Sequence, residues 1–139
     1  MHIEGDTALV TGGATGIGES ICSELAEHGL TIVVADIDEE SATETVETIE
    51  NDGGSAVAVR MDVGSPESVE EGVATAIDAV GGIDVLINNA GIAGPTASVE
   101  DVDPKEWETT LSTNLTGSFL LCRELVPAMK EREYGRIVN

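Results

Sequence analysis

The sequence is poor in positive charge. Its 139 residues include 6 Lys plus Arg against 27 Asp plus Glu, so the formal net charge is −21. A protein that binds duplex nucleic acid needs a basic stripe to hold phosphates, and an anionic membrane surface attracts basic segments. The shortage of cations therefore argues against both nucleic acid and a membrane surface as partners.

Long apolar runs, aromatic residues and cysteines are also scarce. No stretch approaches the roughly 18 apolar residues of a membrane-spanning helix, and residues 1–6 lack the basic and apolar regions of a signal peptide. The two cysteines, Cys22 and Cys122, have no metal-ligand spacing around them. We therefore expect reduced thiols, no metal site and a cytoplasmic location. Because aromatic residues are only 2% of the chain, the core must be aliphatic.

Apolar residues make up 41% of the chain, although its net charge is high. Disordered chains combine high net charge with low hydrophobicity, so we expect a folded domain with an acidic surface. An acidic surface with so few lysines suggests adaptation to high salt, because dissolved ions screen the repulsion between carboxylates.

Strand-like and helix-like segments alternate along the chain. Short β-branched or apolar runs predict strands at 7–11, 31–35, 55–63, 84–88 and 136–139, and helical spacing predicts helices at 17–28, 41–51, 65–80 and 104–132. Ser65 is expected to cap the third helix, with Pro66 in its first turn. The alternation predicts an α/β fold, a Rossmann-type doubly wound parallel sheet of strand order 3-2-1-4-5 that is incomplete after strand 5. A ligand crevice is expected at the carboxyl ends of strands 1 and 4.

A glycine-rich turn, Thr11-Gly-Gly-Ala-Thr-Gly-Ile-Gly18, joins the first strand to the first helix. Glycines let the backbone approach a diphosphate, and the N–H groups and dipole of the following helix favour negative charge. The spacing differs from the common Gly-x-Gly-x-x-Gly, and no Lys-Ser/Thr follows the last glycine, which excludes a P-loop. The turn by itself leaves an ordinary strand–helix connection open as the alternative.

Polar residues follow the next three strands. Asp36 ends the second strand, where a carboxylate can accept hydrogen bonds from ribose hydroxyls and repel a 2′-phosphate. Because no Arg or Lys lies in the glycine turn or directly after Asp36, NAD is favoured over NADP. Asp62 and Val63 end the third strand, where they could meet an adenine ring. After the fourth strand come Asn88-Asn89-Ala90-Gly91, whose amides can tie backbone ends together; an acid at a helix N-terminus and simple turn chemistry are the alternatives.

In this order the motifs resemble the short-chain dehydrogenase/reductase family. The resemblance also includes Asn114 and the terminal Gly135-Arg-Ile-Val-Asn139. It implies interconversion of an alcohol and a ketone by hydride transfer with NAD. The cofactor-binding residues that it implies are Gly12, Thr15, Gly16, Ile17, Gly18, Asp36, Ile37, Asp62, Val63, Asn89, Ala90 and Gly91. Asn114 would help to hold a proton-relay water.

Part of the family's pattern is absent. Its catalytic serine and its Tyr-x-x-x-Lys lie beyond the strand that begins at Arg136, and Tyr134 is no substitute because the residue four positions later is Val138. We therefore expect residues 1–139 to be the N-terminal dinucleotide-binding part of a longer single-domain enzyme for a small alcohol or ketone, inactive alone. The resemblance also implies homo-oligomers formed through helix 104–132. A non-catalytic dinucleotide-binding module and a decayed pseudoenzyme are the alternatives.

Overall fold

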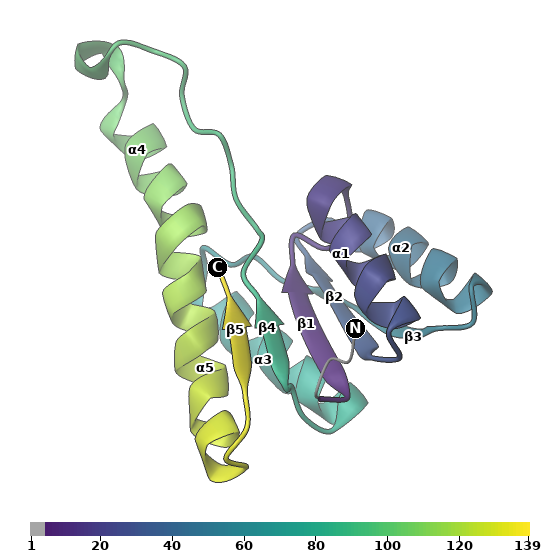
Figure 1. Ribbon diagram of the computed structural model, residues 1–139. Coiled ribbons are helices and arrows are strands. Elements are labelled where there is room, and N and C mark those ends of the chain that lie inside the picture. The colour runs from purple at the N-terminus through teal and green to yellow at the C-terminus, as the bar shows by residue number, and fades with distance from the viewer. Residues whose placement is uncertain (1–4) are drawn as a thin grey trace.

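The computed structural model describes residues 5–139; residues 1–4, part of the segment where no signal peptide is expected, lie outside this range. The protein is built on a five-stranded parallel sheet of order β3-β2-β1-β4-β5 (Figure 1). The strands are β1 (Thr7–Thr11), β2 (Thr31–Asp36), β3 (Ser55–Arg60), β4 (Val85–Ile87) and β5 (Arg136–Val138). The predicted fold class and strand order are confirmed.

Helices cover both faces of the sheet (Figure 1). One face packs against α1 (Gly16–Glu27) and α2 (Glu39–Asn51), and the other packs against α3 (Pro66–Val80) and α5 (Gly117–Glu131). Since side chains alternate along a strand, Leu9 of β1 faces α3 and α5, whereas Val10 faces α1 and α2. None of the buried hydrophobic side chains of residues 5–139 is aromatic, so the core is aliphatic as predicted.

Two element boundaries differ from the prediction by two residues or more, because side chains cap or turn the chain there. Helix α2 begins at Glu39 rather than Ser41, since Asp38 caps it by accepting hydrogen bonds from the Ser41 N–H (3.2 Å) and hydroxyl (2.8 Å). These bonds also hold the pKa of Asp38 below its ordinary value. Strand β3 ends at Arg60 rather than Val63, because the Asp62 carboxylate accepts the N–H of Gly64 and starts a turn.

The expected start of the third helix is confirmed. Ser65 caps α3 by accepting the N–H of Ser68 at 3.3 Å, and Pro66 is the first helical residue.

Within residues 5–139, no helix combines the length and the apolarity that crossing a bilayer requires.

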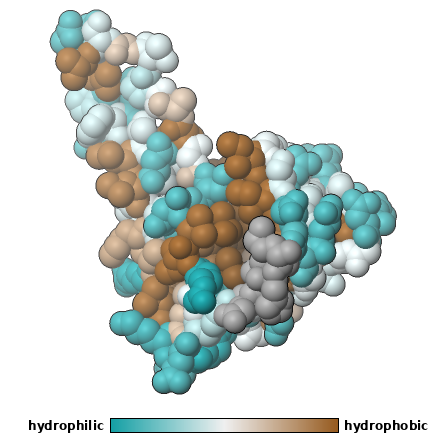
Figure 2. Space-filling view, viewed as in Figure 1, coloured by the Kyte–Doolittle hydropathy of each residue, from teal (hydrophilic) through white to brown (hydrophobic). Residues whose placement is uncertain are grey.

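The expected helix 104–132 is helical through Glu131, but a π-helical turn at Ser112–Thr116 divides it into α4 (Pro104–Leu111) and α5. Helix α4 extends beyond the edge of the sheet (Figure 1). Apolar patches lie on the surface of this projecting part of the molecule (Figure 2). Large apolar side chains of these helices are uncovered: Trp107 is 58% exposed, Leu115 65% and Phe119 61%. The core is instead filled from the opposite face of α5, by Leu121 and Leu125 among others.

Candidate functional site

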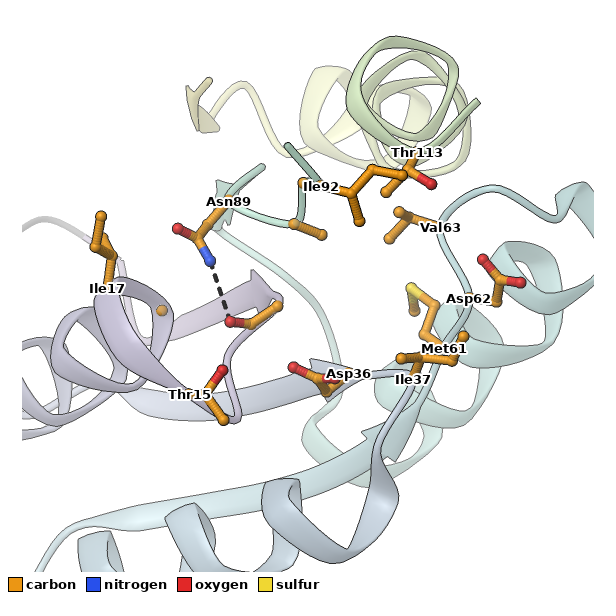
Figure 3. Close-up of a pocket in the computed structure, with 14 residues that line it drawn as sticks. Thr15, Ile17, Asp36, Ile37, Met61, Asp62, Val63, Asn89, Ile92 and Thr113 are labelled. Atoms are coloured by element: carbon orange, nitrogen blue, oxygen red, sulfur yellow. Dashed lines mark hydrogen bonds between the residues drawn. The ribbon is translucent and has the colours of Figure 1, made fainter. Parts of the chain in front are cut away.

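A cavity of about 420 Å³ opens at the carboxyl ends of the central strands. This is the point between β1 and β4 where the strand order reverses, and ligands of open α/β sheets bind at such points. The cavity is lined by Gly12, Thr15, Ile17, Gly18, Asp36, Ile37, Met61, Asp62, Val63, Asn89, Ala90, Gly91, Ile92 and Thr113 (Figure 3). All the residues predicted to bind a cofactor therefore meet here, except Gly16.

The glycine turn is shaped by two positions where no side chain fits. Gly12 has a φ of +62°, and a Cβ added to it would lie 3.0 Å from the Cα of Ala90. A Cβ on Gly18 would overlap the carbonyl oxygen of Gly12. Gly16 lies outside the cavity lining with open space around it, and its φ of +59° is what favours glycine there.

A bracket of hydrogen bonds ties the end of β1 to the end of β4. The Asn89 side-chain amide donates to the carbonyl oxygens of Thr11 (3.0 Å) and Gly12 (3.1 Å; Figure 3). In return the Thr11 hydroxyl accepts the N–H groups of Asn89 and Ala90, both at 3.1 Å, and donates to the carbonyl of Ile87. The prediction for Asn89 as a tie is confirmed, whereas the part of Thr11 was missed. A buried threonine at a strand end directly before glycines was the available signal.

Asp36 presents a fixed carboxylate to the cavity (Figure 3). One oxygen accepts the N–H of Ala14 and the other accepts the N–H of Asp38, each at 3.1 Å. A carboxylate has about four acceptor positions, so acceptor capacity remains for ligand hydroxyls. Arg60 of β3 stands opposite Asp36 in the backbone register of β2 and β3. Sequence reasoning missed this cation because it looked only along the chain and not across strands.

The loop after β3 forms the opposite side of the cavity. The Ser112 hydroxyl donates to the carbonyl of Gly64 at 3.1 Å, which fastens this loop to the π-helical turn. Val63 packs so closely on α5 that a Cβ on Gly117 would lie 2.9 Å from the Val63 Cβ. Met61 and Thr113 also line the cavity and were not predicted, since neither stands in a recognisable motif.

Asn114 lies beside the cavity rather than in its lining. Its side-chain oxygen accepts the N–H of Ile92 and its side-chain N–H donates to the Ile92 carbonyl, each at 2.8 Å. The amide therefore fixes the loop that follows β4, and both of its polar atoms have hydrogen-bond partners. It sits in the π-helical turn, a distortion found frequently at functional sites.

The cysteines contribute no reactive group to this site. Burial raises the pKa of the Cys22 thiol to about 12, and the nearby Glu19 carboxylate adds to the shift. The protonated thiol lies 3.8 Å from the carbonyl oxygen of Gly13 and packs α1 against the glycine turn. Both Cys22 and Cys122 are free. Among residues 5–139, no group of three His, Cys, Asp or Glu side chains is placed to hold a metal ion.

Known proteins are similar to this chain in sequence and in fold. The family model described as short chain dehydrogenase matches residues 6–139. The chain is 37% identical over 137 residues to an uncharacterized oxidoreductase of Thermotoga maritima, covering 99% of this chain and 53% of that protein. It is 36% identical over 139 residues to a D-threitol dehydrogenase of Mycolicibacterium smegmatis, covering 100% and 53%.

Solved structures agree with the sequence matches. The crystal structure of a metagenomic short-chain oxidoreductase in complex with NADP has a TM-score of 0.93 and 30% identity, covering 96% of this chain and 61% of that chain. The chain spans about half the length of the curated relatives it matches.

Proposed function

This chain belongs to the short-chain dehydrogenase family, and we propose on that basis that it forms the NAD(H)-binding part of an oxidoreductase that interconverts an alcohol and a ketone. The observation that carries the proposal is the cavity at the β1–β4 switch point, where the glycine turn, Asp36 and the loop after β3 converge. A bound nicotinamide cofactor would accept or supply the hydride. The residues of this chain would bind and orient that cofactor.

The shape of the glycine turn fits a diphosphate. The absence of Cβ atoms at Gly12 and Gly18 lets the backbone come close to a ligand. The N-terminus of α1 lies directly beside the cavity. Thr15, the N-cap residue, makes no side-chain capping bond to the first turn. The first N–H groups of a helix have no partner within it, and with the helix dipole they favour an anion. Phosphates are thus held without a lysine.

The carboxylate of Asp36 supports NAD rather than NADP as the cofactor. It faces the cavity with two backbone N–H groups fixing its position, so a 2′-phosphate placed beside it would meet a like charge. Asp62 and Val63 would lie against the adenine, and Asn89, Ala90 and Gly91 along the ribose and nicotinamide side. Asn114 would help to hold a relay water.

Calorimetric titration with NAD and NADP tests the proposal. We expect the chain to bind NAD about 10- to 100-fold more tightly, since a like charge at the ribose costs roughly 1.4–2.8 kcal/mol in a partly exposed site. Asp36→Ser should lower the affinity for NAD about tenfold and raise that for NADP. Glu39→Gln removes one charge near Asp36 but outside the cavity, and should leave the preference unchanged. Equal or tighter binding of NADP by the wild-type chain would contradict the assignment.

Binding without turnover is the expected behaviour of these 139 residues. The family's proton donor is the tyrosine of its Tyr-x-x-x-Lys, and this sequence contains no such motif. A reading frame that continues beyond Asn139 with the serine and this motif would support the enzyme. A stop codon there, with measurable NAD binding, would favour a non-catalytic module.

We further propose that two copies pair through the uncovered face of α4 and α5. Trp107, Leu111, Leu115 and Phe119 recur every four residues and are all exposed. Such a stripe of large apolar side chains marks an interaction surface.

Leu115→Lys should weaken this pairing at least about 30-fold, because it places a charge in the middle of an apolar contact worth about 2 kcal/mol. Sedimentation equilibrium in molar KCl measures the dimer constant. Thr109→Lys adds the same charge at an exposed polar position of α4 and serves as the matched control. A wild-type chain that stays monomeric at high concentration would refute the pairing.

A further inference from the structure

The buried hydroxyl of Thr45 contacts a residue outside its own helix. It lies in the middle of α2 and is 3% exposed. Its Oγ1 lies 3.2 Å from the carbonyl oxygen of Ser41, one turn back in the helix, and 3.1 Å from that of Ala14 in the glycine turn. Thr43 and Thr48 of the same helix make the bond to the preceding turn alone. The second contact therefore sets Thr45 apart.

Ala14 is held through both of its backbone groups. Its carbonyl oxygen accepts from Thr45, and its N–H donates to the carboxylate of Asp36 at 3.1 Å. The residue is 5% exposed and stands between Gly12 and Gly16. A chain of hydrogen bonds therefore runs from α2, through the centre of the glycine turn, to the side chain that faces the ribose position.

We propose that Thr45 is a positioning residue for the dinucleotide, acting through Ala14 on both the glycine turn and the carboxylate of Asp36. The inference rests on the proposed function of the cavity. A buried carbonyl that loses its partner is costly, so without the hydroxyl the turn shifts to find another donor. The Ala14 N–H then moves away from Asp36, and the carboxylate loses one of the two bonds that fix it.

Three variants separate this effect from simple destabilisation. Thr45→Val removes the hydroxyl and nearly keeps the shape, whereas Thr45→Ser keeps the hydroxyl. Thr48→Val removes an equivalent helix hydroxyl that is exposed and bonds only to the carbonyl of Glu44 at 3.0 Å. By calorimetry, Thr45→Val should lower the affinity for NAD about tenfold, the effect of one lost hydrogen bond, and that for NADP clearly less. Thr45→Ser and Thr48→Val should keep the wild-type ratio of the two affinities.

A purely structural role would lower both affinities by the same factor, and an unchanged ratio in Thr45→Val would overturn the proposal. Amide hydrogen exchange of Ala14 without any ligand gives an independent readout. Exchange should accelerate in Thr45→Val and not in Thr48→Val, and equal rates in both would also overturn it. If the wild-type chain binds neither dinucleotide, the proposed function fails, while the exchange rates still decide whether Thr45 holds the turn.

Discussion

Replacing Gly18 with alanine should lower the affinity of the proposed site for NAD by up to about 100-fold. The new Cβ would overlap the carbonyl oxygen of Gly12 and lie 2.7 Å from the amide nitrogen of Asn89. The first obstacle is backbone and cannot rotate away. The second is the amide that ties β1 to β4, so a single methyl group opens the turn and the bracket together. Overpacking of this kind costs about 1–3 kcal/mol, which corresponds to a loss of affinity of up to about 100-fold.

Calorimetry with NAD measures the loss for Gly18→Ala, and far-ultraviolet circular dichroism shows whether the helices persist. Ser20→Ala is the control on the same helix, since Ser20 is exposed and its hydroxyl bonds only back to the carbonyl of Gly16. It should bind NAD as the wild type does. Near-normal affinity in Gly18→Ala would mean that the helix can move away from the turn, contrary to the packing seen here.

The melting temperature should rise by about 10 °C or more between dilute buffer and molar KCl. The 6 Lys and Arg residues are too few to neutralise 27 carboxylates. Along α2 and its approach the acids are dense: Asp36, Asp38, Glu39, Glu40, Glu44, Glu47, Glu50 and Asp52. The range of charge repulsion shrinks from about 30 Å at 0.01 M salt to about 3 Å at 1 M. Relief of about 3 kcal/mol of repulsion would raise the melting temperature by the stated amount in a domain of this size.

A triple variant tests whether charge is the cause. Glu40→Gln, Glu44→Gln and Glu47→Gln remove three exposed carboxylates without touching the cavity. Its melting temperature in dilute buffer should be higher than that of the wild type, and its increase with KCl smaller. A melting temperature that does not respond to KCl would end the proposal of adaptation to salt.

The order of the sheet was predictable because each strand and helix carries its own periodicity, and handed crossovers leave few ways to connect them. The site was largely predictable for the same reason, since residues at successive strand ends must meet at one edge. Distortions within a helix and contacts between separate elements could not be predicted from the sequence. Apolar spacing continues through Ser112–Thr116, so nothing in the pattern marks the π-helical turn that brings Thr113 to the cavity. The Thr45 hydroxyl bonds to Ala14, 31 residues earlier in the chain, and Arg60 lies beside Asp36 only in the register of β2 and β3, so neither neighbour could be identified from the sequence.

The glycine turn also has an evolutionary consequence. Every residue except proline carries a backbone N–H, so a diphosphate site built from such groups does not depend on which side chains surround it. Substitutions that change the surface charge can accumulate on α2 or α3 without removing a ligand-binding donor. The proposed site therefore depends on the geometry of the turn and not on the charge of the surrounding surface.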